Sequence, residues 1–221
     1  LFRDNPGMAQ LEVFLALIQA AKYTEWGRKY HFASITNPDV FRSRVPLQDY
    51  NDLKPVVQRL RKGEQNITWP TDVRWFAKSS GTTNDRSKFI PVSREALEEC
   101  HYKGGKDLIA FHYQQFPESN LYKGKSLVVG GSSNSEQFRT DAYSGDLTCI
   151  AGVPSWTLVL MKRILALTGK QNILEVWPNL ELFMHGGVSF RPYRTQFEAL
   201  IPSPTMNYLE SYNASEGSFA V

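Results

Sequence analysis

The sequence is poor in the features that identify several common protein classes. It has only two cysteines, Cys100 and Cys149, and neither belongs to a C-x-x-C pair, which argues against a disulfide framework or a zinc site and favours a reducing compartment. No apolar run approaches the roughly 18 residues that cross a bilayer. The formal net charge is only +3 and comes from scattered charges, so it indicates neither a nucleic-acid nor a membrane partner. We therefore expect a cytoplasmic protein of undefined oligomeric state.

The sequence also lacks the P-loop pattern G-x-x-x-x-G-K-[ST] and the protein-kinase signatures, which argues against both of those groups of ATP-using enzymes. It does have the composition of a folded domain, with 42% hydrophobic and 21% charged residues in a chain of 221. A chain of this length and composition buries a sizeable core. It begins at Leu1 and ends on an apolar run at residues 217–221, from which we expect it to be part of a longer protein.

Helix and strand signals alternate along the chain, which predicts an α/β fold of layered sheets and helices. Asn5 and Pro6 are a typical N-cap and first helical residue, and apolar residues at helical spacing follow to residue 21. Further helices are expected from residue 49 or 52 to 63, from 93 to about 116 with a weak point at Gly104 and Gly105, from 154 to about 167, and from 193 to 200. Strands are expected at residues 73–77, 89–92, 125–129, 182–184 and 206–211.

A turn rich in hydroxyl groups follows the first predicted strand and is the strongest local signal. Its hydroxyl and backbone N–H groups can cradle phosphate oxygens, and the nearby Lys88 can balance charge that shifts between phosphates. The same composition is also typical of an ordinary polar hairpin loop. The turn consists of Ser79, Ser80, Gly81, Thr82 and Thr83.

Paired glycines follow another predicted strand. Gly186 and Gly187 come directly after His185, and glycines allow a ligand to lie against the backbone. The alternative interpretation is a simple turn.

A third group of candidate residues has the sequence Tyr-Asn-Ala-Ser-Glu-Gly at residues 212–217. In a nucleotide site, Tyr212 can stack on the base, Ser215 can bind a phosphoryl oxygen, and Glu216 can hold Mg²⁺. Ordinary surface residues explain the same pattern. All three groups fall at the carboxyl ends of predicted strands, which is where α/β folds bind ligands.

In order and spacing, these motifs resemble the adenylate-forming superfamily of acyl and aminoacyl activating enzymes. The resemblance is closest to the auxin-responsive acyl acid amido synthetases and their bacterial relatives. It includes residues 76–83 and 87–92, and also the earlier segments 24–27 and 45–50, with the sequences Thr-Glu-Trp-Gly and Val-Pro-x-x-x-Tyr.

One segment departs from the superfamily pattern. Residues 84–87 read Asn-Asp-Arg-Ser, where general adenylate-forming enzymes carry glycine and proline, so we expect a shorter and more polar turn. The resemblance further implies that residues 1–221 are the N-terminal part of a large ATP- and acyl-binding domain. The rest of that domain and a mobile C-terminal domain would then lie outside this chain, and we expect the 221 residues alone to be inactive.

The resemblance implies a ligase that works in two steps with ATP and Mg²⁺. A carboxylic acid becomes an acyl-adenylate, and the amine of an amino acid then takes the acyl group to form an amide. The implied roles are phosphate binding by Ser79, Ser80, Gly81, Thr82 and Thr83; catalysis by Lys88, Ser215 and Glu216, the last also binding Mg²⁺; and adenine or adenylate binding by Gly186, Gly187, Tyr212 and Asn213.

The walls of an acyl pocket are less marked in the sequence. Val153, Trp156, Leu160 and His185 are candidates, with plain core packing as the alternative, and no particular acid is selected. Two alternatives to amide synthesis stay open: transfer of the acyl group to the thiol of coenzyme A, and a non-catalytic module that binds a nucleotide or an acyl group. The presence of both Lys88 and Glu216 counts against the second.

Overall fold

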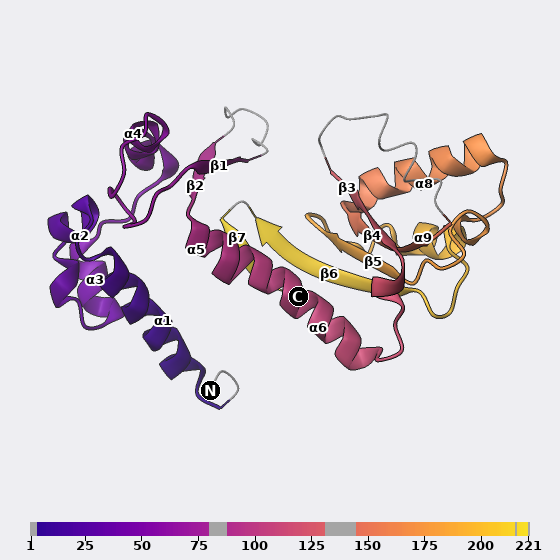
Figure 1. Ribbon diagram of the computed structural model, residues 1–221, viewed down its shortest axis with the longest axis horizontal. Coiled ribbons are helices and arrows are strands. Elements are labelled where there is room, and N and C mark those ends of the chain that lie inside the picture. Colours follow the sequence, from indigo (N-terminus) through magenta and orange to yellow (C-terminus); the bar gives the residue numbers. More distant parts are fainter. Residues whose placement is uncertain (1–3, 80–87, 131–144, 215, 221) are drawn as a thin grey trace. The chain divides into compact units, whose positions relative to one another are not determined.

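The computed structural model describes residues 4–79, 88–130, 145–214 and 216–220. The chain divides into two compact units, Leu1–Cys100 and His101–Val221. Helices and strands alternate in it, and the expected α/β class is confirmed (Figure 1). The α-helices are α1 (Pro6–Ala21), α2 (Glu25–Lys29), α3 (Pro38–Arg44), α4 (Tyr50–Arg61), α5 (Arg94–Ala96), α6 (Lys103–Gln115), α8 (Pro154–Thr168) and α9 (Arg194–Leu200). The strands are β1 (Trp75–Lys78), β2 (Phe89–Val92), β3 (Lys125–Val129), β4 (Leu147–Gly152), β5 (Leu182–Gly186), β6 (Asn207–Ala214) and β7 (Gly217–Ala220).

Helix α1 begins where the sequence predicts. The side chain of Asn5 accepts a hydrogen bond from the backbone N–H of Met8, and Pro6 is the first helical residue. These two residues satisfy one free N–H group of the first turn and remove another, which favours a helix start at this point.

The segment with the sequence Thr-Glu-Trp-Gly forms the start of α2 and serves the packing of the first unit. The buried Thr24 hydroxyl accepts from the N–H of Gly27 at 2.9 Å and donates to the carbonyl of Ala21 at 2.7 Å. A side chain at Gly27 would collide with the same carbonyl. The connection between α1 and α2 is therefore tight, and only glycine fits at Gly27.

Helix α4 is fixed at both ends by charged side chains. Asp49 and Asp52 form a reciprocal capping box at its start, which satisfies two backbone N–H groups. Near its end, Arg59 makes a two-pronged ion pair with Glu25 of α2, at 2.8 and 2.6 Å, and a second ion pair with Glu64 at 2.8 Å. These groups are about half exposed, so each ion pair contributes little to stability.

Strands β1 and β2 form an antiparallel hairpin in the first unit. Lys78 pairs with Phe89 at its closed end. The predicted pair of strands around the hydroxyl-rich turn is therefore confirmed.

The helical stretch that ends in α6 differs from its prediction. Gly104 and Gly105 lie inside a regular α-helix rather than at a break. The irregular part comes earlier, where residues 97–102 adopt π-helical geometry. Gly104 has a packing role instead, because a side chain there would collide with the side chain of Ser218 on β7.

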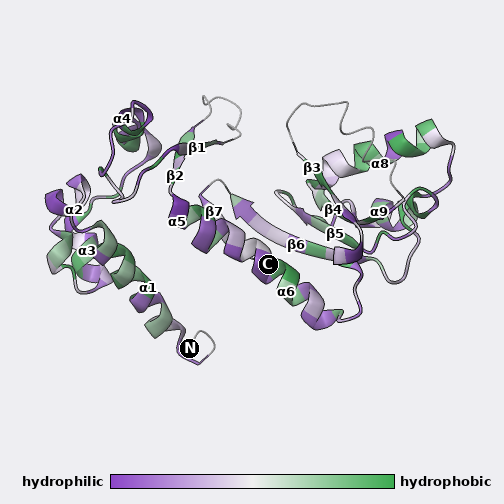
Figure 2. Cartoon of the chain, in the orientation of Figure 1, coloured by the Kyte–Doolittle hydropathy of each residue, from purple (hydrophilic) through white to green (hydrophobic). Residues whose placement is uncertain are grey.

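The second unit is built around a five-stranded sheet with the order β3-β4-β5-β6-β7. Strands β3 to β6 are parallel, and β7 pairs antiparallel with β6. Helix α6 packs on one face of the sheet, where Ile109 and Tyr113 contact buried residues of β4 and β5. Helices α8 and α9 cover the other face. Helix α6 carries both hydrophilic and hydrophobic residues (Figure 2), as expected of a helix with one face on the sheet and one in water.

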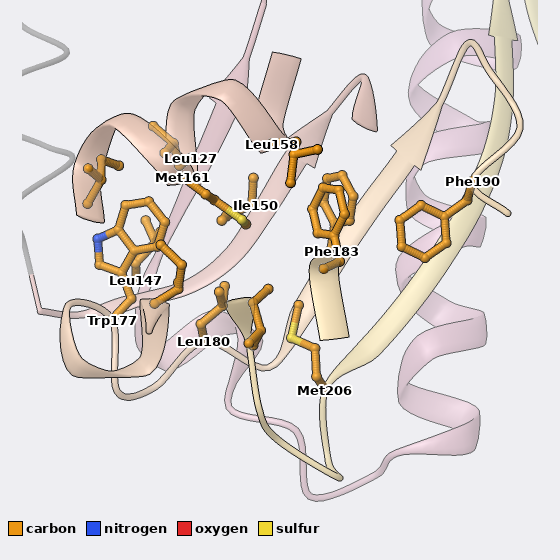
Figure 3. Packing of buried hydrophobic residues seen from close by; sticks show 14 residues of the cluster. Leu127, Leu147, Ile150, Leu158, Met161, Trp177, Leu180, Phe183, Phe190 and Met206 are labelled. Carbon is orange, nitrogen blue, oxygen red and sulfur yellow. The ribbon is translucent and has the colours of Figure 1, made fainter. Parts of the chain in front are cut away.

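The main core lies between the sheet and helices α8 and α9. Met161 and Leu158 of α8 lie near Ile150 and Phe183 of the sheet (Figure 3). Phe183 is fully buried and stacks on Phe197 of α9 with ring centroids 4.7 Å apart. Burial of this many large apolar side chains is the dominant stabilising term of the second unit.

Two features of the sheet were missed or misplaced by the sequence-based prediction. Strand β4 lies between β3 and β5, and its first four residues are buried, yet no strand was expected at residues 147–152. Strand β6 extends to Ala214 and so includes Tyr212 and Asn213, whereas the strand was expected to end at residue 211. Within the described ranges, none of the helices combines the length and apolarity needed to span a bilayer.

Candidate functional site

A cavity of about 370 Å³ lies at the carboxyl ends of the parallel strands in the second unit. Parallel strands direct their carboxyl ends to one edge of the sheet, and ligands of α/β proteins bind there. Strands β3, β4 and β5 end in this lining at Val129, Gly152 and Gly186, and Ser211 of β6 pairs with Gly186. The full lining is Leu108, Val128, Val129, Ala151, Gly152, Val153, Met184, His185, Gly186, Gly187, Ser211 and Asn213.

Three positions of this lining are occupied by glycine, for different structural reasons. A side chain at Gly186 would collide with the carbonyl oxygen of Ser211 on the neighbouring strand, and one at Gly152 would meet Val129 at 2.9 Å. Gly187 has a φ of +82°, a conformation that favours glycine, and a side chain there would lie 3.6 Å from Val153. The cavity floor is therefore bare backbone: close strand packing excludes a side chain at Gly152 and Gly186, and the positive φ of the turn after β5 favours glycine at Gly187.

His185 is buried beside the cavity and stacks on Phe190, with ring centroids 4.2 Å apart. Burial lowers the pKa of its imidazole below the ordinary value, so the ring is neutral at pH 7. Its Nδ1 atom is buried and has no hydrogen-bond partner within the described part of the chain; the same holds for the hydroxyl of Tyr208. Burial raises the pKa of Tyr208 to about 12.

The predicted adenylate-binding residues fall partly in this cavity. Gly186, Gly187 and Asn213 line it. The Asn213 side chain donates to the hydroxyl of Ser211 at 3.2 Å, and that hydroxyl lies 3.4 Å from the carbonyl of His185. Tyr212 is next in the chain but outside the lining; it is 58% exposed and packs against Phe219 of β7, with ring centroids 5.3 Å apart.

The predicted acyl-pocket residues divide into two pairs. Val153 and His185 line the cavity. Leu160 packs against the main core, and Trp156 is 53% exposed on α8, so neither belongs to the lining. The structure thus brings two of these four residues together with the paired glycines.

Ser79 and Lys88 belong to the first unit, where they close the hairpin of β1 and β2. The N–H of Ser79 donates to the carbonyl of Lys88 at 2.9 Å, and the N–H of Lys88 lies 3.2 Å from the hydroxyl of Ser79. The two predicted phosphate-site residues are therefore held in register at the base of the turn. The predicted residues Ser80, Gly81, Thr82 and Thr83 lie outside the described residues, and so does Ser215.

The described residues offer single carboxylates rather than a cluster of metal ligands. Within the described part of the chain, no three His, Cys, Asp or Glu side chains gather into a group that could hold a metal. Glu216 is exposed in the turn between β6 and β7. One accessible carboxylate is enough for Mg²⁺ that is bound mainly by substrate phosphates and water.

Sequence reasoning missed the part of the lining that comes from β4 and α6. Ala151 and Gly152 end a strand that was not predicted, although the run of residues 147–152 is a short apolar segment bounded by Asp146 and Pro154. Such runs are typical of buried parallel strands. No local signal indicates Leu108, because its place in the lining depends on how α6 packs on the sheet.

The fold and the cavity define the class of the protein: an α/β protein with a cavity at the carboxyl edge of a parallel sheet. Comparison with known proteins defines the family. The chain matches the GH3 family N-terminal domain over residues 1–146 and 135–206. It belongs to the GH3 family.

Curated relatives and solved structures agree with this assignment. The chain is 31% identical over 137 residues to jasmonoyl–L-amino acid synthetase JAR6 of Nicotiana attenuata, covering 62% of this chain and 23% of that protein. It is 30% identical over 129 residues to indole-3-acetic acid-amido synthetase GH3.2 of Arabidopsis thaliana, covering 56% and 22%. The structure of AtGH3.15 acyl acid amido synthetase in complex with 2,4-DB matches with a TM-score of 0.74 at 15% identity, covering 96% of this chain and 53% of the other.

The structural match and the sequence matches are limited in different ways, by identity and by coverage. At 15% identity the structural match shows the shared fold alone. The aligned region spans less than a quarter of each of these two curated relatives and about half of the solved structure.

Proposed function

We propose that the full-length protein carrying this chain is a ligase that activates a carboxylic acid with ATP and joins it to an amino acid. The proposal rests on one observation above all: the cavity at the carboxyl edge of the sheet has a bare glycine floor at the paired-glycine motif. Membership of the GH3 family supports it, because one similar curated relative is named a jasmonoyl–L-amino acid synthetase and another an indole-3-acetic acid-amido synthetase.

The reaction has two steps. A carboxylate oxygen of the acid attacks the α-phosphorus of ATP. The bond between the α-phosphorus and the oxygen that bridges to the β-phosphate breaks, and pyrophosphate leaves. The amine nitrogen of the amino acid then attacks the acyl carbon, the bond to the AMP oxygen breaks, and the amine loses a proton. The first step needs positioning and charge stabilisation rather than a covalent enzyme nucleophile.

The proposed roles follow the chemistry of each side chain. Ser79 binds phosphate together with Ser80, Thr82 and Thr83, and Lys88 balances the charge of the departing pyrophosphate. In the second unit, Gly186 and Gly187 form the floor beneath the adenylate. The remaining roles are adenine contact by Tyr212 and Asn213, binding of the α-phosphoryl group by Ser215, and binding of Mg²⁺ by Glu216.

The apolar half of the cavity lining is the proposed entry to the acyl pocket. Val153 and Met184 offer apolar contact, and burial keeps the imidazole of His185 neutral, so these three residues add no charge to the lining. Apolar walls with a few polar groups are typical of small-molecule sites. This favours a carboxylic acid with an apolar body.

The test is product analysis with the full-length protein. ATP, a panel of carboxylic acids and a pool of amino acids are supplied, and amide and AMP are measured by mass spectrometry. Acid-dependent formation of both is expected. Omission of the amino acids should stop amide formation, and a matched reaction with coenzyme A distinguishes an amide synthetase from a thioester-forming enzyme.

A thioester in the coenzyme A reaction and no amide would refute the proposed acceptor. Nucleotide binding with neither product from any acid of the panel would refute the ligase function and favour a binding module.

A further inference from the structure

Tyr50 is the first residue of α4 and contacts the hairpin that carries Lys88. Its hydroxyl accepts a hydrogen bond from the backbone N–H of Phe89 at 2.8 Å, and the same hydroxyl lies 3.5 Å from the Phe89 carbonyl oxygen. Phe89 is the first residue of β2 and directly follows Lys88. The tyrosine thus holds the backbone one residue from the lysine.

This contact pairs a backbone group on the outer edge of the two-stranded hairpin. Each strand of such a hairpin has an outer row of N–H and C=O groups without strand partners. On the inner side, the N–H and C=O of Lys88 already pair with Ser79. The hydroxyl of Tyr50 supplies the partner for Phe89 on the outer side, so β2 is held from both sides at the base of the turn.

Charged side chains reinforce the same contact. The ammonium nitrogen of Lys88 lies 5.6 Å from the centre of the Tyr50 ring, within the range of a cation–π interaction. At the other end of α4, the guanidinium of Arg61 lies 3.9 Å from the centre of the Phe89 ring. Helix α4 therefore contacts the backbone N–H of Phe89 through Tyr50, the side chain of Lys88 through the Tyr50 ring, and the ring of Phe89 through Arg61.

We propose that Tyr50 is a positioning residue for Lys88: through the Phe89 N–H and its own ring, it sets where the lysine ammonium can reach. This inference rests on the proposed function, in which Lys88 balances the charge of departing pyrophosphate. Tyr50 itself touches no reacting atom.

The test is ATP–pyrophosphate exchange by the full-length protein with a carboxylic acid that it accepts, comparing Tyr50→Phe with Tyr30→Phe. Tyr30 is a matched control. Its hydroxyl also accepts one hydrogen bond, from the side chain of Gln48 at 3.4 Å, and the ammonium nitrogen of Lys29 lies 5.0 Å from the centre of its ring. Both variants keep the ring and lose one hydroxyl. Thermal unfolding curves establish that both are folded.

For Tyr50→Phe, we expect the KM for pyrophosphate to rise about fivefold, the effect of one lost hydrogen bond of ordinary strength. The KM for the acid and the affinity for AMP should stay as in the unsubstituted protein, because neither involves the outer phosphates. Tyr30→Phe should change none of these values.

Two results would overturn the role of Tyr50. One is a Tyr50→Phe variant that matches Tyr30→Phe in every constant. The other is a KM for the acid and an affinity for AMP that change as much as the KM for pyrophosphate, which is the pattern of a general structural contact. Absence of exchange in the unsubstituted protein is a distinct outcome, and it removes the proposed function and this role together.

Discussion

Replacement of Gly187 by alanine is expected to weaken nucleotide binding while leaving the protein folded. Gly187 has a φ of +82°, and an L-residue in that conformation costs about 1–2 kcal/mol. Alanine recovers about 0.4–1 kcal/mol by restricting the unfolded chain, so the free energy of unfolding should fall by about 1 kcal/mol. The added methyl group would lie 3.6 Å from Val153, an ordinary contact, so the turn can accommodate it.

The same methyl group would occupy the cavity floor on which the adenylate is proposed to lie. We expect the dissociation constant for AMP, measured by calorimetry on the full-length protein, to rise about tenfold, which corresponds to about 1.4 kcal/mol. Gly169→Ala is the matched control, because Gly169 has a φ of +68° at the end of α8 and open space around it. Equal losses of affinity in both variants, or full affinity in Gly187→Ala, would refute the proposed floor.

Three further predictions concern stability. Thr24→Ala removes a buried helix cap that binds the N–H of Gly27 and should lower the free energy of unfolding by about 1–2 kcal/mol in denaturant titrations; an unchanged midpoint would contradict the capping role. Phe183→Ala empties a fully buried site and should cost about 3–5 kcal/mol, whereas a loss below about 1 kcal/mol would mean that the core is packed differently. Burial lowers the pKa values of His112 and His185 from the ordinary 6.5, so the unfolded chain binds protons at a higher pH than the folded chain. Stability should therefore be full above about pH 6.5 and decline as the pH falls below it, ahead of the carboxylates; a melting temperature that stays constant from about pH 7 to 5 would argue against it.

The sequence predicted the fold best where short-range chemistry decides the structure. Asn5 with Pro6, and the capping pair Asp49 and Asp52, define helix starts through contacts within four residues. Gly169 adopts the left-handed conformation that ends α8. These signals need no knowledge of tertiary packing, so the helix positions that depend on them were predicted correctly.

The errors arise where distant parts of the chain decide the structure. A six-residue apolar run such as residues 147–152 has no periodicity that separates a buried strand from a helix, and β4 becomes evident only between β3 and β5. Tyr212 and Asn213 carry loop-like polar neighbours, yet pairing with β7 keeps them extended. Gly104 looks like a helix breaker until the approach of Ser218 explains it.

The candidate site was predictable only where a general rule for α/β folds applies. The rule that α/β proteins bind ligands at the carboxyl ends of strands identified Gly186, Gly187 and Asn213 before their geometry was known. Val153 and His185 were expected nearby and line the same cavity. The contribution of Leu108 depends on the packing of α6 against the sheet, for which the sequence carries no local signal.

The measurement that tests the central claim most directly is ATP–pyrophosphate exchange by the full-length protein across a panel of carboxylic acids. Lys88→Ala and Glu216→Ala serve as controls for the adenylation chemistry. Acid-dependent exchange that both substitutions abolish is the predicted result, and it would also identify the acid. A folded protein that binds ATP but supports no exchange with any acid of the panel would contradict adenylation.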